Sequence, residues 1–277
     1  MEVFIITDEL KKAYTDSLPT QVLDESDLFF GAQEGADPAG VAAIRAMGNE
    51  FLLTYIFVRK EFRRQGVGTM LMDTVKDTLQ QIGADRLEII YTLNEMTAEL
   101  HDFLEEQELT EDRDEDEKPV MRMYFKDIPE QYRTRKTTET IVTLKDVSGR
   151  QWSKYTADYE RIKEKVPEYA IELKPRDYYD PDYSVVRLND RKEIEAAMLF
   201  SKYGNDLVLE YMNRLTWPEK ADFMSLFFGA VQKAKGADPD MSISYCIYNP
   251  RFRKVSDLIS DQRAEQIGVS MTQYIEF

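Results

Sequence analysis

The chain has 277 residues, of which 43% are hydrophobic, and a net charge of −16 from 36 basic and 52 acidic side chains. This length suits two domains, and the negative charge opposes binding to nucleic acid or to an anionic membrane surface. A single cysteine, Cys246, and a single histidine, His101, exclude an internal disulfide and a Cys/His zinc site, so we expect no metal. No signal peptide or long apolar span is recognised, which predicts a cytoplasmic protein.

Apolar runs and turn residues divide the first half into alternating strands and helices. The expected elements are strand Val3–Ile6, helix Asp8–Tyr14, strands Leu28–Ala32, Gly40–Met47 and Phe51–Val58, helix Thr69–Ile82, strand Leu87–Leu93, helix Ala98–Gln107 and strand Val120–Phe125. The apolar face of the longest helix is expected to consist of Leu71, Val75, Leu79 and Ile82. This mixture predicts the α/β class, with a mixed sheet.

The second half repeats the first. Gly48–Ile56 has a counterpart in Gly204–Met212, 156 residues later, and Gly83-Ala84-Asp85 recurs 153 residues later as Gly236-Ala237-Asp238. The remaining expected counterparts are Asn249 for Asn94, a helix face with Met224, Phe228 and Val231, a strand at Ser242–Tyr248 and a closing strand at Gln273–Phe277. A period of this length is that of a domain rather than of a solenoid unit.

These repeats predict two copies of one fold, with domains at 1–130 and 140–277. The join is expected near Asp127–Thr140, where Pro129 and a basic run interrupt the apolar pattern. The acidic run Glu111–Glu117 is expected to be a solvated loop inside the first copy.

A basic loop with two glycines joins the aromatic strand to the long helix. Its sequence is Arg59-Lys60-Glu61-Phe62-Arg63-Arg64-Gln65-Gly66-Val67-Gly68-Thr69. Glycine permits positive φ and close approach, and the first turn of a helix offers unpaired N–H donors at its positive end. The loop therefore predicts a phosphate or pyrophosphate site, with a plain strand-to-helix turn as the alternative. It lacks the Gly-Lys-Ser/Thr of a Walker loop and the third glycine of the dinucleotide fingerprint.

Several segments around this loop resemble the GNAT acetyltransferases. Arg63–Gly68 is similar to the family's Gln/Arg-x-x-Gly-x-Gly/Ala signature, and Phe103–Leu109 is similar to its Phe-Tyr-Glu-Lys-Leu-Gly-Phe segment. Leu87–Ile89 resembles the strand that follows the signature, and Asn94 the asparagine beyond it. The resemblance implies two tandem GNAT-like domains, each a mixed, mostly antiparallel twisted sheet flanked by helices. It reaches the second copy only through the internal repeat.

The same resemblance implies acetyl-CoA as cosubstrate and direct attack of an amine on the thioester. The backbone of the loop would hold the pyrophosphate, and the end of the aromatic strand would pair with the pantetheine arm. An amide at that strand end would also bind the developing oxyanion. The implied cofactor-binding residues are Phe57, Val58, Arg63, Arg64, Gln65, Gly66, Val67, Gly68, Thr69 and Asn94.

Candidate catalytic groups are carboxylates and a tyrosine. Glu88 is the first candidate for the general base and Glu50 the second, although each could be an ordinary solvated strand residue. The tyrosine that protonates the departing thiolate in the family is replaced here by Leu104. Tyr91, Tyr124 or water could take its place, and His101, although near this segment, is expected to be a surface or packing residue.

The second copy has lost the loop. The offset of 156 residues places Glu219, Asp222 and Met224 opposite Arg63, Gly66 and Gly68. Carboxylates there would repel a pyrophosphate, so this copy is expected to cover the first, to shape the acceptor site or to bind a second ligand. Either core packing or a site for a cationic amine would explain its aromatic residues Trp152, Tyr178, Tyr179, Tyr183 and Trp217.

Three functions follow from these patterns. The first is an N-acetyltransferase, the second a non-catalytic acetyl-CoA sensor or regulatory protein, and the third an unrelated module that binds nucleotide phosphates. The expected partners are a small-molecule or peptide amine, with no nucleic acid and no membrane, and the expected assembly is a monomer or homodimer. The sequence does not name the acceptor.

Overall fold

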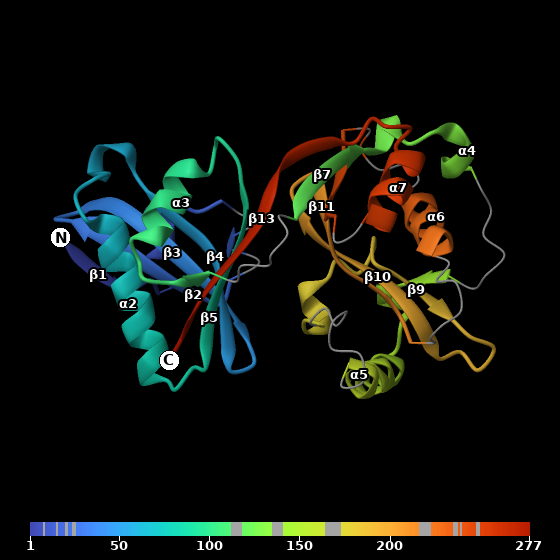
Figure 1. Ribbon diagram of the computed structural model, residues 1–277. Helices are drawn as coiled ribbons and strands as arrows, with labels where there is room; N and C mark the ends of the chain where they lie inside the picture. The colour runs from blue at the N-terminus through green and yellow to red at the C-terminus, as the bar shows by residue number, and fades with distance from the viewer. Residues whose placement is uncertain are drawn as a thin grey trace. The chain divides into compact units, whose positions relative to one another are not determined.

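In the computed structural model the chain divides into two α/β units (Figure 1). The first consists of Met1–Glu117 and Gly268–Phe277, and the second of Lys118–Ile267. The structure describes every residue except 8, 15, 20–21, 24–25, 112–117, 135–140, 164–172, 216–222, 235–237, 239 and 248–249. Outside this description lie Asp8, the acidic loop after Glu111, Trp217, Glu219, Asp222, Gly236, Ala237 and Asn249.

The first unit is a mostly antiparallel sheet with its long helix on one face. Its strands are β1 (Glu2–Ile5), β2 (Leu28–Glu34), β3 (Asp37–Met47), β4 (Glu50–Val58), β5 (Arg86–Leu93), β6 (Thr110–Glu111) and β13 (Glu265–Glu276). Its helices are η1 (Lys11–Tyr14), η2 (Lys60–Phe62), α2 (Val67–Gln81) and α3 (Ala98–Glu105). The strand order is β1-β2-β3-β4-β5-β13, with β6 beside β13, and β4 and β5 run parallel.

Helix α2 covers the sheet with the expected apolar face, with one exception. Leu71, Val75 and Leu79 are fully buried, as are Leu87 and neighbouring side chains of the sheet. The prediction for Ile82 is wrong, because this side chain is 58% exposed. Ile82 is the C-cap of the helix rather than part of its last turn, so its side chain turns away from the buried face.

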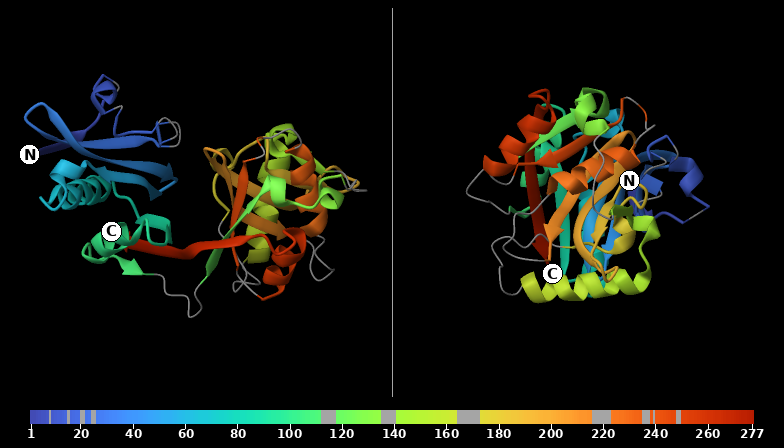
Figure 2. Two further views of the ribbon diagram at one scale, coloured as in Figure 1. Left: turned by 90° about the horizontal axis from the view of Figure 1, so that it is seen from above. Right: turned by 90° about the vertical axis from the view of Figure 1, so that its right-hand side faces the viewer.

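The second unit repeats this architecture. Its strands are β7 (Pro119–Tyr124), β8 (Ile141–Thr143), β9 (Val185–Leu188), β10 (Ile194–Tyr203), β11 (Asp206–Arg214) and β12 (Ser242–Cys246), in the order β7-β12-β11-β10-β9-β8. Its helices are η3 (Phe125–Asp127), α4 (Glu130–Arg133), η4 (Leu144–Asp146), α5 (Gly149–Lys163), η6 (Arg176–Tyr178), α6 (Phe223–Lys233) and α7 (Pro250–Ile259). Figure 2 shows α5 as a long separate helix, which the sequence patterns above do not include.

The internal repeat is confirmed in the pairing of the strands. Glu50–Leu52 pairs in parallel with Arg86–Glu88, and Asp206–Val208 pairs in parallel with Ser242–Ser244, each 156 residues later. The β-bulge between β3 and β4 lies at Thr54, since Ala43 pairs with Tyr55 and Ile44 with Leu53. The bulge between β10 and β11 lies at Glu210, again 156 residues later.

A side-chain contact is repeated as well. Asn49 Nδ2 donates to Asp85 at 2.9 Å, and Asn205 Nδ2 donates to Asp238 at 3.1 Å. Both contacts join the turn before the bulged strand to the start of its parallel neighbour. The two units are therefore copies of one fold, with two tandem mixed sheets flanked by helices.

The closing strands are exchanged between the copies, which corrects their expected places. Val120–Phe125 was expected to close the first copy, but β7 pairs with β12 in the second unit. Gln273–Phe277 was expected to close the second copy, but β13 pairs with β5 from Val269 to Glu276 (Figure 2, red strand). The units therefore differ from the contiguous ranges 1–130 and 140–277.

The aromatic residues of the second unit serve its core. Trp152, Tyr178 and Tyr179 are buried, and the ring of Trp152 lies edge-on to that of Tyr179 at 6.3 Å. Tyr183 is half-buried and packs against the main apolar cluster of the unit. For these residues the packing interpretation holds. Within the described part of the chain, no helix has both the length and the apolarity needed to cross a membrane.

Candidate functional site of the first unit

The sheet of the first unit opens between two of its strands. β4 pairs with β5 only through Glu50–Leu52, although β4 continues to Val58 and β5 to Leu93. Over the described residues, the edge of β4 from Leu53 to Val58 that faces β5 has no strand partner. The bulge at Thr54 lies at the start of this free edge, because the extra residue turns the strand away from its neighbour. An extended group can pair with such an edge as an added strand.

The loop after β4 ends at an uncapped helix start. Gly66 is the N-cap of α2, with φ of 79°, and no side chain caps the helix there. A Cβ atom placed on Gly66 would have no atom within 4 Å, so the first turn faces open space. Arg64 also adopts positive φ, 60°, which aims successive backbone N–H groups toward one side. The N–H groups of this turn lack intrahelical acceptors and form the positive end of the helix, as an anion site requires.

The side chains of the loop brace its backbone. Gln65 Nε2 donates to the carbonyl oxygen of Glu61 at 2.7 Å, and Arg63 Nε donates to the carbonyl oxygen of Val58 at 3.1 Å. Arg59 turns inward and donates to Ser17 Oγ at 3.2 Å. Gln65 and Arg59 thus fix the shape of the loop, while Arg63 stands at the end of the free β4 edge.

Two glycines bring the walls of the site together. A Cβ atom on Gly40 would lie 2.9 Å from the carbonyl oxygen of Phe57 and 3.2 Å from side-chain atoms of Val67 and Leu71. A Cβ atom on Gly68 would lie 3.1 Å from the ring of Phe103 in α3. The absence of both side chains lets β4, α2 and α3 approach each other closely.

The two candidate carboxylates lie at different distances from the opening. Glu88 stands opposite Leu52 in the last paired register, where the strands begin to diverge, and its side chain is 17% exposed. Arg86 Nη2 lies 3.9 Å from its carboxylate. Glu50 stands opposite Arg86, two registers farther from the opening. The position of Glu88 suits a group that reaches the opening, and that of Glu50 does not.

A tyrosine, a histidine and a glutamate form a chain on the other face of β5. The hydroxyl of Tyr91 and Nδ1 of His101 are 2.7 Å apart, and Nε2 of His101 lies 3.6 Å from Glu105 Oε1. Tyr91 shares its face with Leu87 and Ile89, while Glu88 points to the opposite face. The imidazole can donate a proton to the phenol oxygen.

Sequence reasoning missed the contact between His101 and Tyr91. The only sequence signal was its spacing of four residues from Glu105, which places both on one helix face. The bond to Tyr91 crosses from α3 to β5 and depends on tertiary packing. Leu104, at the family's tyrosine position, is fully buried in the core. Tyr124 lies in β7 of the second unit.

Asn94 has a local role in the turn before α3. Its Oδ1 accepts a hydrogen bond from the backbone of Met96 at 2.9 Å, and Thr97 Oγ1 accepts one from the backbone of Asn94 at 2.9 Å. Thr97, the N-cap of α3, also donates to the carbonyl oxygen of Thr92 at 2.7 Å. This network sets the direction in which α3 leaves β5, and thereby the position of His101.

Comparison with known proteins agrees with this architecture. Residues 4–108 match the sequence model described as the acetyltransferase (GNAT) family. These residues contain the opened strands, the loop and α3. The first unit is thus similar to the GNAT acetyltransferases over these residues, and the two units together share the fold of a tandem GNAT protein. A search of curated proteins found no match.

Solved structures share the fold at low sequence identity. A GCN5-related glucosamine N-acetyltransferase region of a fungal multi-domain GH3 β-N-acetylglucosaminidase is 12% identical with a TM-score of 0.63, over 99% of this chain and 38% of that one. The chain therefore spans well under half of that protein. A tandem GNAT protein from the clavulanic acid biosynthesis pathway is 10% identical with a TM-score of 0.62, over 95% and 86% of the chains.

A third neighbour is the GCN5-related N-acetyltransferase from Sphaerobacter thermophilus. It is 14% identical with a TM-score of 0.55, over 97% of this chain and 85% of that one. At these identities the neighbours establish the fold of both copies, and the activity has to be argued from the site.

Proposed function

We propose that the first unit transfers the acetyl group of acetyl-CoA to an amine. The observation that carries the proposal is the free edge of β4 ending at the uncapped start of α2. An extended pantetheine arm would pair with Phe57 and Val58, and the pyrophosphate would meet the N–H groups from Arg64 to Thr69. Arg63 would add a positive charge beside that anion.

The carboxylate and the phenol divide the proton transfers. Glu88 accepts a proton from the ammonium form of the acceptor, directly or through water, and the amine nitrogen then attacks the thioester carbon. As the carbon–sulfur bond breaks, the nitrogen releases its second proton to solvent, and the thiolate sulfur takes the hydroxyl proton of Tyr91. Tyr91 regains a proton from Nδ1 of His101, which is 19% exposed and recovers its own from solvent. Because Glu88 and Tyr91 face opposite sides of β5, acceptor and thiol approach from opposite faces.

A matched pair of glycine substitutions tests the binding site. Gly66→Val places a side chain in the open space before α2, whereas Gly35→Val makes the same change at a second positive-φ glycine, in the turn between β2 and β3. Both carry a similar backbone cost of about 1–2 kcal/mol. We expect calorimetry to show acetyl-CoA affinity at least tenfold lower for Gly66→Val and unchanged for Gly35→Val. Equal affinities in the two variants would contradict the proposed site.

The choice of ligand and the release of thiol test the chemistry. Coenzyme A and acetyl-CoA should bind far more tightly than ATP, because ATP has no arm to pair with β4. Release of free thiol in the presence of a panel of primary amines would establish the transferase. Tight acetyl-CoA binding without thiol release would instead favour the sensor, to which the burial of Leu104 at the usual tyrosine position gives some weight.

A further inference from the structure

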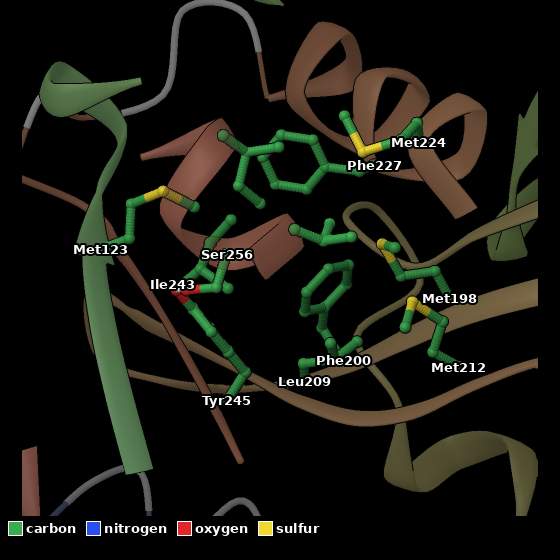
Figure 3. A pocket seen from close by; sticks show the side chains of 12 residues that line it. Met123, Met198, Phe200, Leu209, Met212, Met224, Phe227, Ile243, Tyr245 and Ser256 are labelled. Atoms are coloured by element: carbon green, nitrogen blue, oxygen red, sulfur yellow. Dashed lines mark hydrogen bonds between the residues drawn. The ribbon is translucent and has the colours of Figure 1, made fainter. Parts of the chain in front are cut away.

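The second unit contains an apolar cavity of about 70 Å³ between its sheet and its last two helices (Figure 3). Figure 3 shows Met123 on one side of this space and Met198 and Met212 on the other, with Met224 and Phe227 of α6 beside it. Helix α7 completes the wall with Val255, Ser256 and Ile259. This volume is several times that needed to hold one water molecule. The cores of folded proteins contain few voids of this size.

The lining has almost no capacity for hydrogen bonds. Among the described residues of the lining, the only hydroxyl groups are those of Ser256 and Tyr245, which lie 2.6 Å apart and bond to each other. Water in the cavity would lose hydrogen bonds with no replacement, and so would any polar part of a ligand. A hydrocarbon group would lose none and would gain by leaving water. The chemistry of the walls therefore selects an aliphatic ligand.

Comparison of the two copies shows why the cavity exists. Met224 is the second residue of α6, and its counterpart Gly68 is the second residue of α2. In the first unit the bare backbone of Gly68 lets the ring of Phe103 from α3 close the gap between the helices. In the second unit the side chain of Met224 stands in the wall of the cavity between α6 and α7. The two copies therefore pack differently at this position of the fold.

The shape of the cavity can adapt to an unbranched chain. Four of its lining residues are methionines, carried by β7, β10, β11 and α6. Methionine is unbranched and flexible, so these side chains can move apart around a ligand longer than the resting space allows. Met212, Met224 and Val255 are half-buried, whereas Met123 and Met198 are buried, so the cavity has an open end and a closed end.

We propose that the second unit binds a small molecule through an unbranched aliphatic chain, which enters between α6 and α7. The aliphatic chain of the ligand would lie beside the place where β11 and β12 diverge. The pairing of these two strands stops at Val208 and Ser244. This copy has acidic residues where the first has its glycine loop, as Glu219 and Asp222 replace Arg63 and Gly66. The ligand is therefore not expected to carry a coenzyme A nucleotide. The proposal stands independently of the acetyl transfer proposed for the first unit.

Calorimetry on the full chain with butanol, hexanol, octanol and decanol tests this proposal. Affinity is expected to rise about fourfold per added methylene until the cavity is full, and then to level off. Val255→Phe fills the cavity from α7 and should weaken octanol binding at least tenfold. Leu258→Phe enlarges an exposed side chain on the same helix and should leave the affinity unchanged.

A third variant is expected to enlarge the cavity, whereas Val255→Phe fills it. Met224→Ala widens the cavity and should move the preferred alcohol to a longer chain, which a misfolded protein would not show. Acetyl-CoA affinity, measured on every variant, serves as the control for the first unit and keeps the two proposals separable. The absence of binding across the alcohol series, or equal octanol affinity in the wild type and Val255→Phe, would overturn the proposal.

Discussion

The contact between Tyr91 and His101 is the residue-scale feature on which turnover is expected to depend. Tyr91→Phe keeps the ring and removes the proton donor, so we expect kcat to fall about 100-fold, while acetyl-CoA affinity stays the same. His101→Gln should lower kcat as well, and the double variant should be no worse than Tyr91→Phe, since the two groups act in series.

Steady-state kinetics and calorimetry on the three variants measure these effects. Tyr132→Phe removes a hydroxyl from a stacked ring of the second unit and provides the matched control. Additive losses in the double variant would show that the histidine acts separately from the tyrosine.

At the scale of single residues, local sequence patterns predicted much of the candidate site. The glycines and basic residues of the loop follow one another in the chain, so their arrangement could be read from Arg59–Thr69 alone. The bond between Tyr91 and His101 could not, because it joins two elements across a turn. The place of Asn94 in the turn before α3, where its Oδ1 accepts a hydrogen bond from the backbone of Met96, could not be read from the sequence either.

Burial can also change the acid–base behaviour of a repeated position. Thr54 at the first bulge shares a 2.6 Å hydrogen bond with Ser26. Its counterpart Glu210 accepts hydrogen bonds from Ser201 Oγ and from Tyr178 Oη at 3.1 Å. Burial raises the pKa of the Glu210 carboxyl, and these hydrogen bonds oppose the rise. The same place in the fold thus holds a neutral hydroxyl in one copy and a titratable group in the other.

At the scale of elements, the approach of β3 to β4 depends on Gly40. Gly40→Ala would place a Cβ atom 2.9 Å from a backbone oxygen, which cannot move aside as a flexible side chain would. We expect the free energy of unfolding to fall by about 1–3 kcal/mol and acetyl-CoA affinity to fall with it, because Phe57 and Val67 must shift.

Urea unfolding and calorimetry together measure both effects. Gly149→Ala at the start of α5 is the matched control, since no atom lies within 4 Å of its added Cβ. Its stability should be unchanged or slightly higher. An equal loss of stability in both variants would show that the close approach at Gly40 is not the cause.

Element positions were predictable where the hydrophobic period is strong. The long helix and the central strands were expected within a few residues of α2, β4 and β5. Helix α5 was missed because its sequence is polar overall, although Trp152, Tyr155 and Tyr159 repeat at helical spacing and are buried. The short strands β6 and β8 carry too few residues to show a period.

For the whole molecule, the first unit depends on β13 as its last strand. β13 pairs with β5 from Val269 to Glu276, and the side chain of Gln273 is buried there. A fragment of residues 1–117 contains the entire candidate acetyl-CoA site but leaves this edge of β5 unpaired. We expect the fragment to aggregate and to bind no acetyl-CoA.

Rejoining the strand provides the matched control. Residues 265–277 attached after residue 117 through a glycine–serine linker should restore a folded, acetyl-CoA-binding unit, as judged by circular dichroism and calorimetry. A soluble 1–117 fragment that binds acetyl-CoA as tightly as the full chain would refute the dependence on β13.

The exchange of strands could not be predicted from the sequence. Val120–Phe125 and Gln273–Phe277 are both short apolar segments at the ends of their copies, and either could complete either sheet by its pattern. Tertiary contacts decide which sheet each of these strands joins. The alternation of apolar and polar side chains along a strand does not specify its partner strand.

The place of β13 also has a consequence for biosynthesis. During translation, the glycine loop before α2 leaves the ribosome early, yet its sheet waits for a strand made about 200 residues later. A product whose synthesis stops before β13 therefore lacks the last strand of the first unit. On the function proposed above, an isolated first half would have no acetyl transfer activity until the last strand is made.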